Sequence, residues 1–181
     1  MLALKKVYVL LVMLSFCIFP NLTYAYVTNV QTVMDSNGNT LAIWQDELNT
    51  GYFYLFASVL PAGGTWSTPV NISSAGGLNA TLPKMAINSS GNAIVIWTAY
   101  NSSVGYNSLY GASLTGLTTW SSAVQVSEDE ENVFENSVVR LSDGDDMVIT
   151  WVSYSYLTFE SVIRSAAATF GTWPTPETIS P

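Results

Sequence analysis

The feature of this chain that most restricts its fold is a segment of about 53 residues that occurs three times. In each copy an Asn- or Asp-rich turn leads into an apolar run that ends in tryptophan, at residues 35–44, 88–97 and 142–151. A second tryptophan opens a short segment that ends in Ile-Ser or Val-Ser, at residues 66–73, 120–127 and 173–180. The first tryptophans are spaced by 53 and 54 residues and the second by 54 and 53, so two independent signatures share one period. A constant period of this length predicts a repeat architecture.

Each copy predicts four short strands, because Val, Ile, Thr and aromatic residues lie between turn residues. The turn between the first two strands has the composition of a tight hairpin. In the third copy Asp145 stands where the others have Gly38 and Gly91, so we expect that turn to differ. The fourth strand is expected to begin at the second tryptophan. The other strands are predicted at 30–34, 84–87 and 138–141, then 41–44, 94–97 and 147–151, then 53–59, 108–114 and 161–167.

Two all-β architectures accept three four-stranded repeats. A β-trefoil closes with three copies, whereas a β-propeller uses one repeat per blade and four to eight blades. The apolar runs at 41–44 and 94–97 do not alternate with polar residues. Such runs predict burial on both faces, as between stacked blades. The predicted fold is therefore an all-β partial β-propeller, or one completed by oligomerisation, with a β-trefoil as the alternative.

Residues 1–25 have the organisation of an export signal, with Lys5 and Lys6 before an apolar stretch and a small residue, Ala25, at the expected cleavage point. The apolar stretch is shorter than the roughly 20 residues that cross a bilayer. We therefore expect cleavage after Ala25 and a secreted, periplasmic or extracellular product without membrane insertion. Its three repeats, at 26–80, 81–135 and 136–181, are expected to form one domain.

Charge and composition exclude several functions. After residue 25 the chain keeps three cations (Lys84, Arg140 and Arg164) against 13 carboxylates, a net charge of −10. Proteins that bind nucleic acids carry a basic surface, so we expect no nucleic-acid partner. The chain has no histidine, and its one cysteine, Cys17, lies in the export signal. Serine and cysteine hydrolase chemistry and His/Cys zinc sites are therefore excluded, which leaves acid–base chemistry by carboxylates.

The two signatures resemble the blade repeats of secreted bacterial β-propellers of the sialidase-like (BNR-type) superfamily. The resemblance covers residues 27–180 and concerns the repeated sequence pattern, not the motifs of an enzyme. The Asp-box of sialidases has a glycine three residues before its tryptophan, whereas Gly38 and Gly91 precede Trp44 and Trp97 by six. A sialidase-like site would also need a cluster of arginines, and the two available arginines fall in one repeat.

Aromatic residues are the candidate binding groups. Residues that recur once per repeat build the core of repeat proteins, so Trp44, Trp97 and Trp151 are expected between neighbouring blades. Trp66, Trp120 and Trp173 could lie in the core or on the surface. Loops carry function more often than strands do, and the best ligand-binding candidates are therefore tyrosines in variable loops: Tyr100, Tyr106 and Tyr110.

Two turns place oxygen ligands at alternate positions, as calcium loops do. The same residues also occur in hairpin turns without metal. No cofactor is expected, and the alternative is a bound calcium ion. The candidate calcium ligands are Asp35, Asn37 and Asn39 in the first turn and Asp143, Asp145 and Asp146 in the third.

The sequence favours a secreted, non-catalytic binding or scaffolding module that engages a glycan or a protein through its loop face. The alternatives are a degenerate sialidase-like glycoside hydrolase and a truncated fragment of a longer propeller. Three blades leave an apolar face at each end, and such faces promote association. We therefore expect a homo-oligomer.

Overall fold

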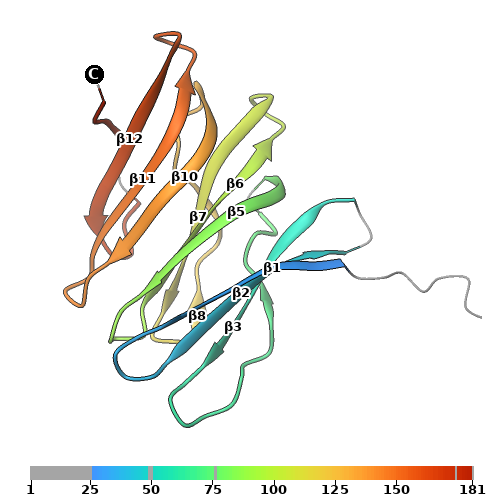
Figure 1. Ribbon diagram of the computed structural model, residues 1–181, viewed down its shortest axis with the longest axis vertical. Helices are drawn as coiled ribbons and strands as arrows, with labels where there is room; N and C mark the ends of the chain where they lie inside the picture. Colours follow the sequence, from blue (N-terminus) through green and yellow to red (C-terminus); the bar gives the residue numbers. More distant parts are fainter. Residues whose placement is uncertain (1–25, 49–50, 76, 174, 181) are drawn as a thin grey trace, which may run out of the picture.

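The computed structural model describes residues 26–48, 51–75, 77–173 and 175–180 (Figure 1). The predicted export signal at 1–25 and its cleavage point lie outside the described residues. All regular secondary structure within the described ranges is β-strand. These ranges contain no helix that is long and apolar enough to cross a membrane.

The described strands form three antiparallel sheets, each built from one copy of the repeat (Figure 1). We call them blades 1, 2 and 3. Blade 1 contains β1 (Tyr26–Met34), β2 (Thr40–Glu47), β3 (Phe53–Leu60) and β4 (Val70–Asn71). Blade 2 contains β5 (Leu78–Ile87), β6 (Ala93–Asn101), β7 (Tyr106–Thr115), β8 (Thr119–Trp120) and β9 (Val124–Gln125). Blade 3 contains β10 (Glu131–Leu141), β11 (Asp146–Ser155), β12 (Glu160–Thr169) and β13 (Glu177–Thr178).

Each sheet is a meander in which consecutive strands pair, except that β9 of blade 2 pairs with β7. The first strands β1, β5 and β10 lie along one side of the stack, and β5 contacts both of the others (Figure 1). The three sheets are open and stacked face to face, and no barrel closes within the described residues. This all-β arrangement is that of consecutive propeller blades, as predicted, and not that of the alternative β-trefoil.

Two details of the predicted strands are wrong. The fourth strand of each blade is only two residues long, and in blade 2 it is split into β8 and β9, which both pair with β7. In addition, β1, β5 and β10 begin at Tyr26, Leu78 and Glu131, earlier than the first strands predicted at 30–34, 84–87 and 138–141.

The turn of the third repeat has the same backbone conformation as the turns of the first two, contrary to expectation. Asp145 has φ = +66°, in the same left-handed region as Gly38 at +86° and Gly91 at +74°. Its N–H donates to the carbonyl of Ser142 at 3.1 Å, as the N–H of Gly91 does to Asn88 at 3.0 Å. Aspartate is one of the few side chains that tolerate this conformation.

The hydrophobic core consists of two interfaces between blades. We call the side of a blade that meets the following blade its front face, and the side that meets the preceding blade its rear face. Between blades 1 and 2, Leu41 and Leu55 of the first pack with Val95 and Trp97 of the second. Between blades 2 and 3, the front-face residues Ile94, Ile96 and Leu109 pack with Met147, Ile149 and Trp151.

The predicted burial of the first tryptophans is confirmed for two of the three. Trp97 and Trp151 are fully buried. Trp44 is only half-buried, so its placement between blades is a correction: it lies on the rear face of blade 1, which no described blade precedes. All of residues 93–99 are buried, as predicted for a strand covered on both sides, whereas β11 alternates between buried and exposed positions.

Candidate functional site

Three tyrosines from blades 2 and 3 gather where the loops between second and third strands lie. The ring centres of Tyr106 and Tyr156 are 4.9 Å apart, and those of Tyr154 and Tyr156 are 5.1 Å apart. Tyr106 begins β7, Tyr154 lies near the end of β11, and Tyr156 follows β11 in the loop. We call these three residues the tyrosine cluster, and Tyr156 keeps 42% of its surface exposed.

The connection between blades 2 and 3 fixes the tyrosine cluster. The hydroxyl of Tyr106 donates to the backbone carbonyl of Asp129, and the N–H of Tyr156 donates to the carbonyl of Glu130 at 2.9 Å. Burial raises the pKa of the Tyr106 phenol, and the neighbouring Glu130 carboxylate raises it further. The phenol therefore stays protonated and able to donate at neutral pH.

A cavity of about 220 Å³ adjoins the loop that carries Tyr156. Ser155 and Leu157, the neighbours of Tyr156, line it together with Glu128, Glu160 and Arg164. Leu157 and Phe159 in the same loop are 69% and 72% exposed. This end of blade 3 thus combines aromatic and apolar surface with carboxylates and one guanidinium.

Arg164 is held in that cavity by two ion pairs. Its guanidinium pairs with Glu128 and with Glu131, whose side chain is buried. The other oxygen of Glu131 accepts a hydrogen bond from Nε1 of Trp151 at 3.3 Å. The pairing partner of Trp151 across the sheet is Arg164, at the position where the other blades carry Phe56 and Tyr110.

A second cavity, of about 270 Å³, lies along the first strands of all three blades. Gln31 of β1, Lys84 of β5 and Arg140 of β10 line it. It is an open groove that contains two of the three cations after residue 25. Arg140 lies here and Arg164 lies in the other cavity, so the two arginines do not form one anion-binding cluster.

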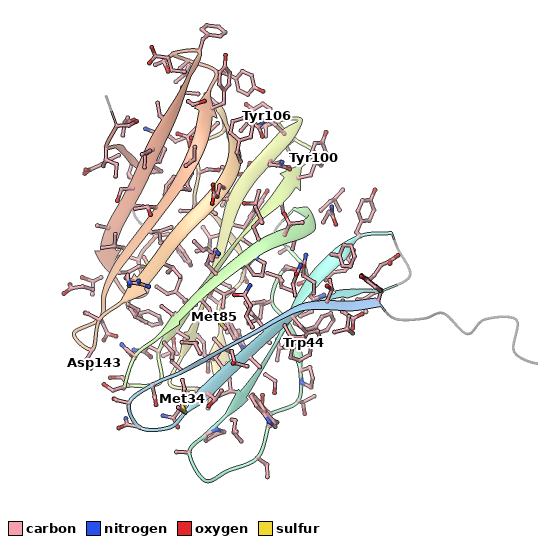
Figure 2. All side chains as sticks on the ribbon, in the orientation of Figure 1. Met34, Trp44, Met85, Tyr100, Tyr106 and Asp143 are labelled. Atoms are coloured by element: carbon pink, nitrogen blue, oxygen red, sulfur yellow. The ribbon has the colours of Figure 1, made fainter. Side chains whose placement is uncertain are left out.

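The three predicted tyrosines have different environments. Tyr106 belongs to the tyrosine cluster, and Tyr100 is 43% exposed near the end of β6; both lie at the end of blade 2 away from Asp143 and Met34 (Figure 2). Tyr110 is not an exposed loop residue. It lies within β7, is only 7% exposed, and stacks on Trp97 at 6.4 Å.

The first calcium candidates are engaged in their own turn. The Asp35 carboxylate accepts hydrogen bonds from the N–H groups of Asn37 and Asn39, both at 2.8 Å, and from the Asn39 amide at 2.7 Å. The Asn37 amide donates to the carbonyl of Ser89 in blade 2 at 2.7 Å. These contacts cap the turn and join it to the next blade.

The third turn is joined to blade 2 in the same way. Asp143 accepts the N–H and hydroxyl of Ser89 at 2.8 and 2.6 Å, and Asp145 accepts the amides of Asn88 and Asn92 at 2.8 and 3.0 Å. Asp146 is exposed at the start of β11. Among the described residues no group of three or more His, Cys, Asp or Glu side chains is placed to hold a metal ion. Calcium binding stays a prediction.

Sequence reasoning missed Tyr154 and Tyr156. The segment from Tyr154 to Tyr156 was visible as a tyrosine-bearing loop. The missing information was that this loop meets Tyr106 of the preceding blade. Equivalent loops of consecutive blades lie side by side in a propeller, and that rule would have suggested the contact.

Comparisons with known proteins show the fold alone. No protein-family profile matches the sequence, and a search of curated proteins gives no match. The structure is similar to that of the Hadza microbial sialidase Hz136, with a TM-score of 0.57 and 12% identity over 84% of this chain and 37% of that one. It is also similar to the polysaccharide lyase Uly1, with a TM-score of 0.53 and 9% identity over 84% of this chain and 40% of that one. The chain thus spans about two-fifths of the length of these two structures, and its fold is similar to the corresponding part of each.

Proposed function

We propose that this protein is a secreted carbohydrate-binding module that holds a glycan on the tyrosine cluster without cleaving it. The observation that carries the proposal is the contact among Tyr106, Tyr154 and Tyr156 across two blades. Tyrosine offers an apolar ring for stacking and a hydroxyl for hydrogen bonding, and binding sites combine such surfaces with a few polar groups. The similar folds of a sialidase and a polysaccharide lyase, both named for action on carbohydrate, support this ligand class.

The charge around the tyrosine cluster favours a neutral glycan. Asp129 and Glu130 are exposed beside Tyr106 and Tyr156, and Glu128 and Glu160 line the adjoining cavity. Carboxylates accept hydrogen bonds from sugar hydroxyls, but they repel sialic acids and uronic acids. Only Arg164 opposes them there, and its guanidinium is already paired with two glutamates.

The same residues support the proposal of binding without turnover. Glycoside hydrolysis needs a carboxylic acid and a second carboxylate on either side of the scissile bond. In the cavity beside the cluster, the carboxylate of Glu128 is engaged in an ion pair with Arg164. Glu160 also lines this cavity, so the rival hypothesis of a degenerate glycoside hydrolase would need Glu160 and a second carboxylate on opposite sides of the bound glycan.

Calorimetric titration against neutral, sialylated and uronate-containing oligosaccharides tests the proposal. We expect binding to a neutral oligosaccharide and an affinity about 10-fold lower in Tyr156→Ala, since the loss of one stacking ring corresponds to about 1.4 kcal/mol. Tyr52→Ala is the matched control, because Tyr52 is also 42% exposed but belongs to blade 1. Equal losses in both variants, preference for the acidic sugars, binding of a protein alone, or release of sugar product would each contradict the proposal.

A further inference from the structure

The rear face of blade 1 has the aromatic pair of a buried interface, but no other blade covers it among the described residues. In blade 2, Trp97 and Tyr110 stack with ring centres 6.4 Å apart and an interplanar angle of 18°, and blade 1 buries both. The equivalent pair in blade 1, Trp44 and Phe56, stacks with nearly the same geometry, 6.2 Å and 19°. Both of these rings are only half-buried. The first blade therefore carries the same aromatic surface that binds a preceding blade elsewhere in the chain.

The second tryptophans show the same relationship. Trp120 and Trp173 are half-buried and pack against the cores between blades 1 and 2 and between blades 2 and 3. Their equivalent in blade 1, Trp66, is 49% exposed. Three aromatic side chains on the rear face of blade 1 thus occupy the positions that contact a neighbouring blade in the other two repeats.

The front face of blade 3 shows the complementary relationship. Val148 and Ile163 occupy the positions of Ile94 and Leu109, which are fully buried against blade 3. Val148 is 40% exposed and Ile163 is 44% exposed. Within the part of the chain that the structure describes, no front face covers blade 1 and no rear face covers blade 3.

We propose that a second copy of this chain covers both ends at once. The front face of blade 3 of each copy packs on the rear face of blade 1 of the other, with contacts of the kind already present at both internal interfaces. Two copies then form a ring of six blades, within the four to eight that close a propeller. A two-fold axis along the centre of the ring generates both contacts. The proposal goes beyond glycan binding and does not depend on it.

The second copy is favoured over other occupants because it supplies both missing surfaces. A different protein would have to carry a front face and a rear face of this repeat to cover both ends. Closure also completes the groove along the first strands. Lys84 and Arg140 of both copies would then surround one central channel, which a single chain lines only in part.

Light scattering coupled to size-exclusion chromatography of the purified protein tests the proposal. We expect twice the mass of one chain at micromolar concentration. Ile163→Glu on the front face of blade 3 should raise the dissociation constant more than about 30-fold, since an anchor residue at an interface contributes 2 kcal/mol or more. Val148→Lys serves as an independent variant of the same face. Circular dichroism shows whether each variant stays folded.

Val124→Glu is the matched control for a charge on an exposed valine. Val124 is 37% exposed in β9, on the outer edge of blade 2, and the third repeat carries Glu177 at the equivalent position. This variant should keep the wild-type mass. If it dissociates as Ile163→Glu does, the association does not use the two end faces and the proposal fails.

Mixing two variants distinguishes front-to-rear pairing from pairing of like faces. Ile163→Glu and Trp66→Glu should each be monomeric alone, because each disrupts both contacts of the ring. Their equimolar mixture should recover dimers, because one intact front face then meets one intact rear face. A monomeric wild-type protein, a mixture that stays monomeric, chains of growing mass, or association only with a different protein would each overturn the proposal.

Discussion

Gly111 of blade 2 lies directly beneath the ring of Trp173 in blade 3. A Cβ atom at position 111 would stand 2.3 Å from Cη2 of that ring, closer than any real contact. The equivalent residue in blade 1 is Ala57, so the absence of a side chain at this position is particular to the contact between blades 2 and 3.

Gly111→Ala should therefore destabilise the protein by about 1–3 kcal/mol, the usual cost of overpacking. The reason is that Trp173 must move away from its place against the core. Urea unfolding measures the change. Gly144→Ala is the control, because the nearest atom to its added Cβ would be 3.6 Å away and its φ is not positive. Equal midpoints for the two variants would contradict the contact.

Trp97→Ala should cost about 3–5 kcal/mol, the range for emptying a buried aromatic site. Trp97 is fully buried between blades 1 and 2 and stacks on Tyr110. Leu157→Ala, at a position 69% exposed, should change the free energy of unfolding by less than about 0.5 kcal/mol. A Trp97→Ala protein that unfolds at the wild-type urea midpoint would place this side chain on the surface.

Glu131→Gln should destabilise the protein by about 3 kcal/mol, because it leaves Arg164 buried with one ion-pair partner fewer. The side chain of Glu131 is 2% exposed and that of Arg164 is 12% exposed, so water cannot replace the lost charge. Chemical unfolding at pH 7 measures the loss. The exposed Glu177→Gln removes the same charge on the outer edge and should be nearly neutral. A neutral Glu131→Gln would show that the pair does not form.

Ser89→Ala should raise the pKa of Asp143 towards its ordinary value of 3.8. The hydroxyl of Ser89 and then its N–H hold that pKa low in the folded protein. Because the folded pKa is depressed, the contact stabilises the fold above the unfolded pKa and is lost as pH falls through the folded pKa. Carboxyl NMR titration measures the shift, with Ser122→Ala as the control. An unchanged pKa of Asp143 would show that the Ser89 hydroxyl does not donate to this carboxylate.

The repeat made most of the fold predictable. Two tryptophan signatures with one period placed three sheets, and the apolar runs placed Trp97 and Trp151 in the core. Trp44 has the same sequence context as Trp97, and the difference between them lies in whether a blade precedes theirs. A pattern within one repeat contains no information on that neighbour, so the half-burial of Trp44 was missed.

The candidate site was predicted only in part. Tyr106 was found from its variable loop, but Tyr154 and Tyr156 join it through a contact between blades, which the spacing along the chain does not reveal. Tyr110 was misplaced because its equivalents, Phe56 and Arg164, differ in type. Without a recurring aromatic residue, its position in the core did not stand out.

The central claim, that a glycan binds on the tyrosine cluster, is tested most directly by NMR. Side-chain resonances of the protein, including those of the tyrosine rings, are followed while a neutral oligosaccharide that binds in calorimetry is added. We predict that the resonances of Tyr106, Tyr154 and Tyr156 shift together and saturate, while those of Tyr26 and Tyr52 in blade 1 stay unchanged. Shifts confined to Gln31, Lys84 and Arg140, with the tyrosine cluster unaffected, would contradict the claim and place the ligand in the groove along the first strands.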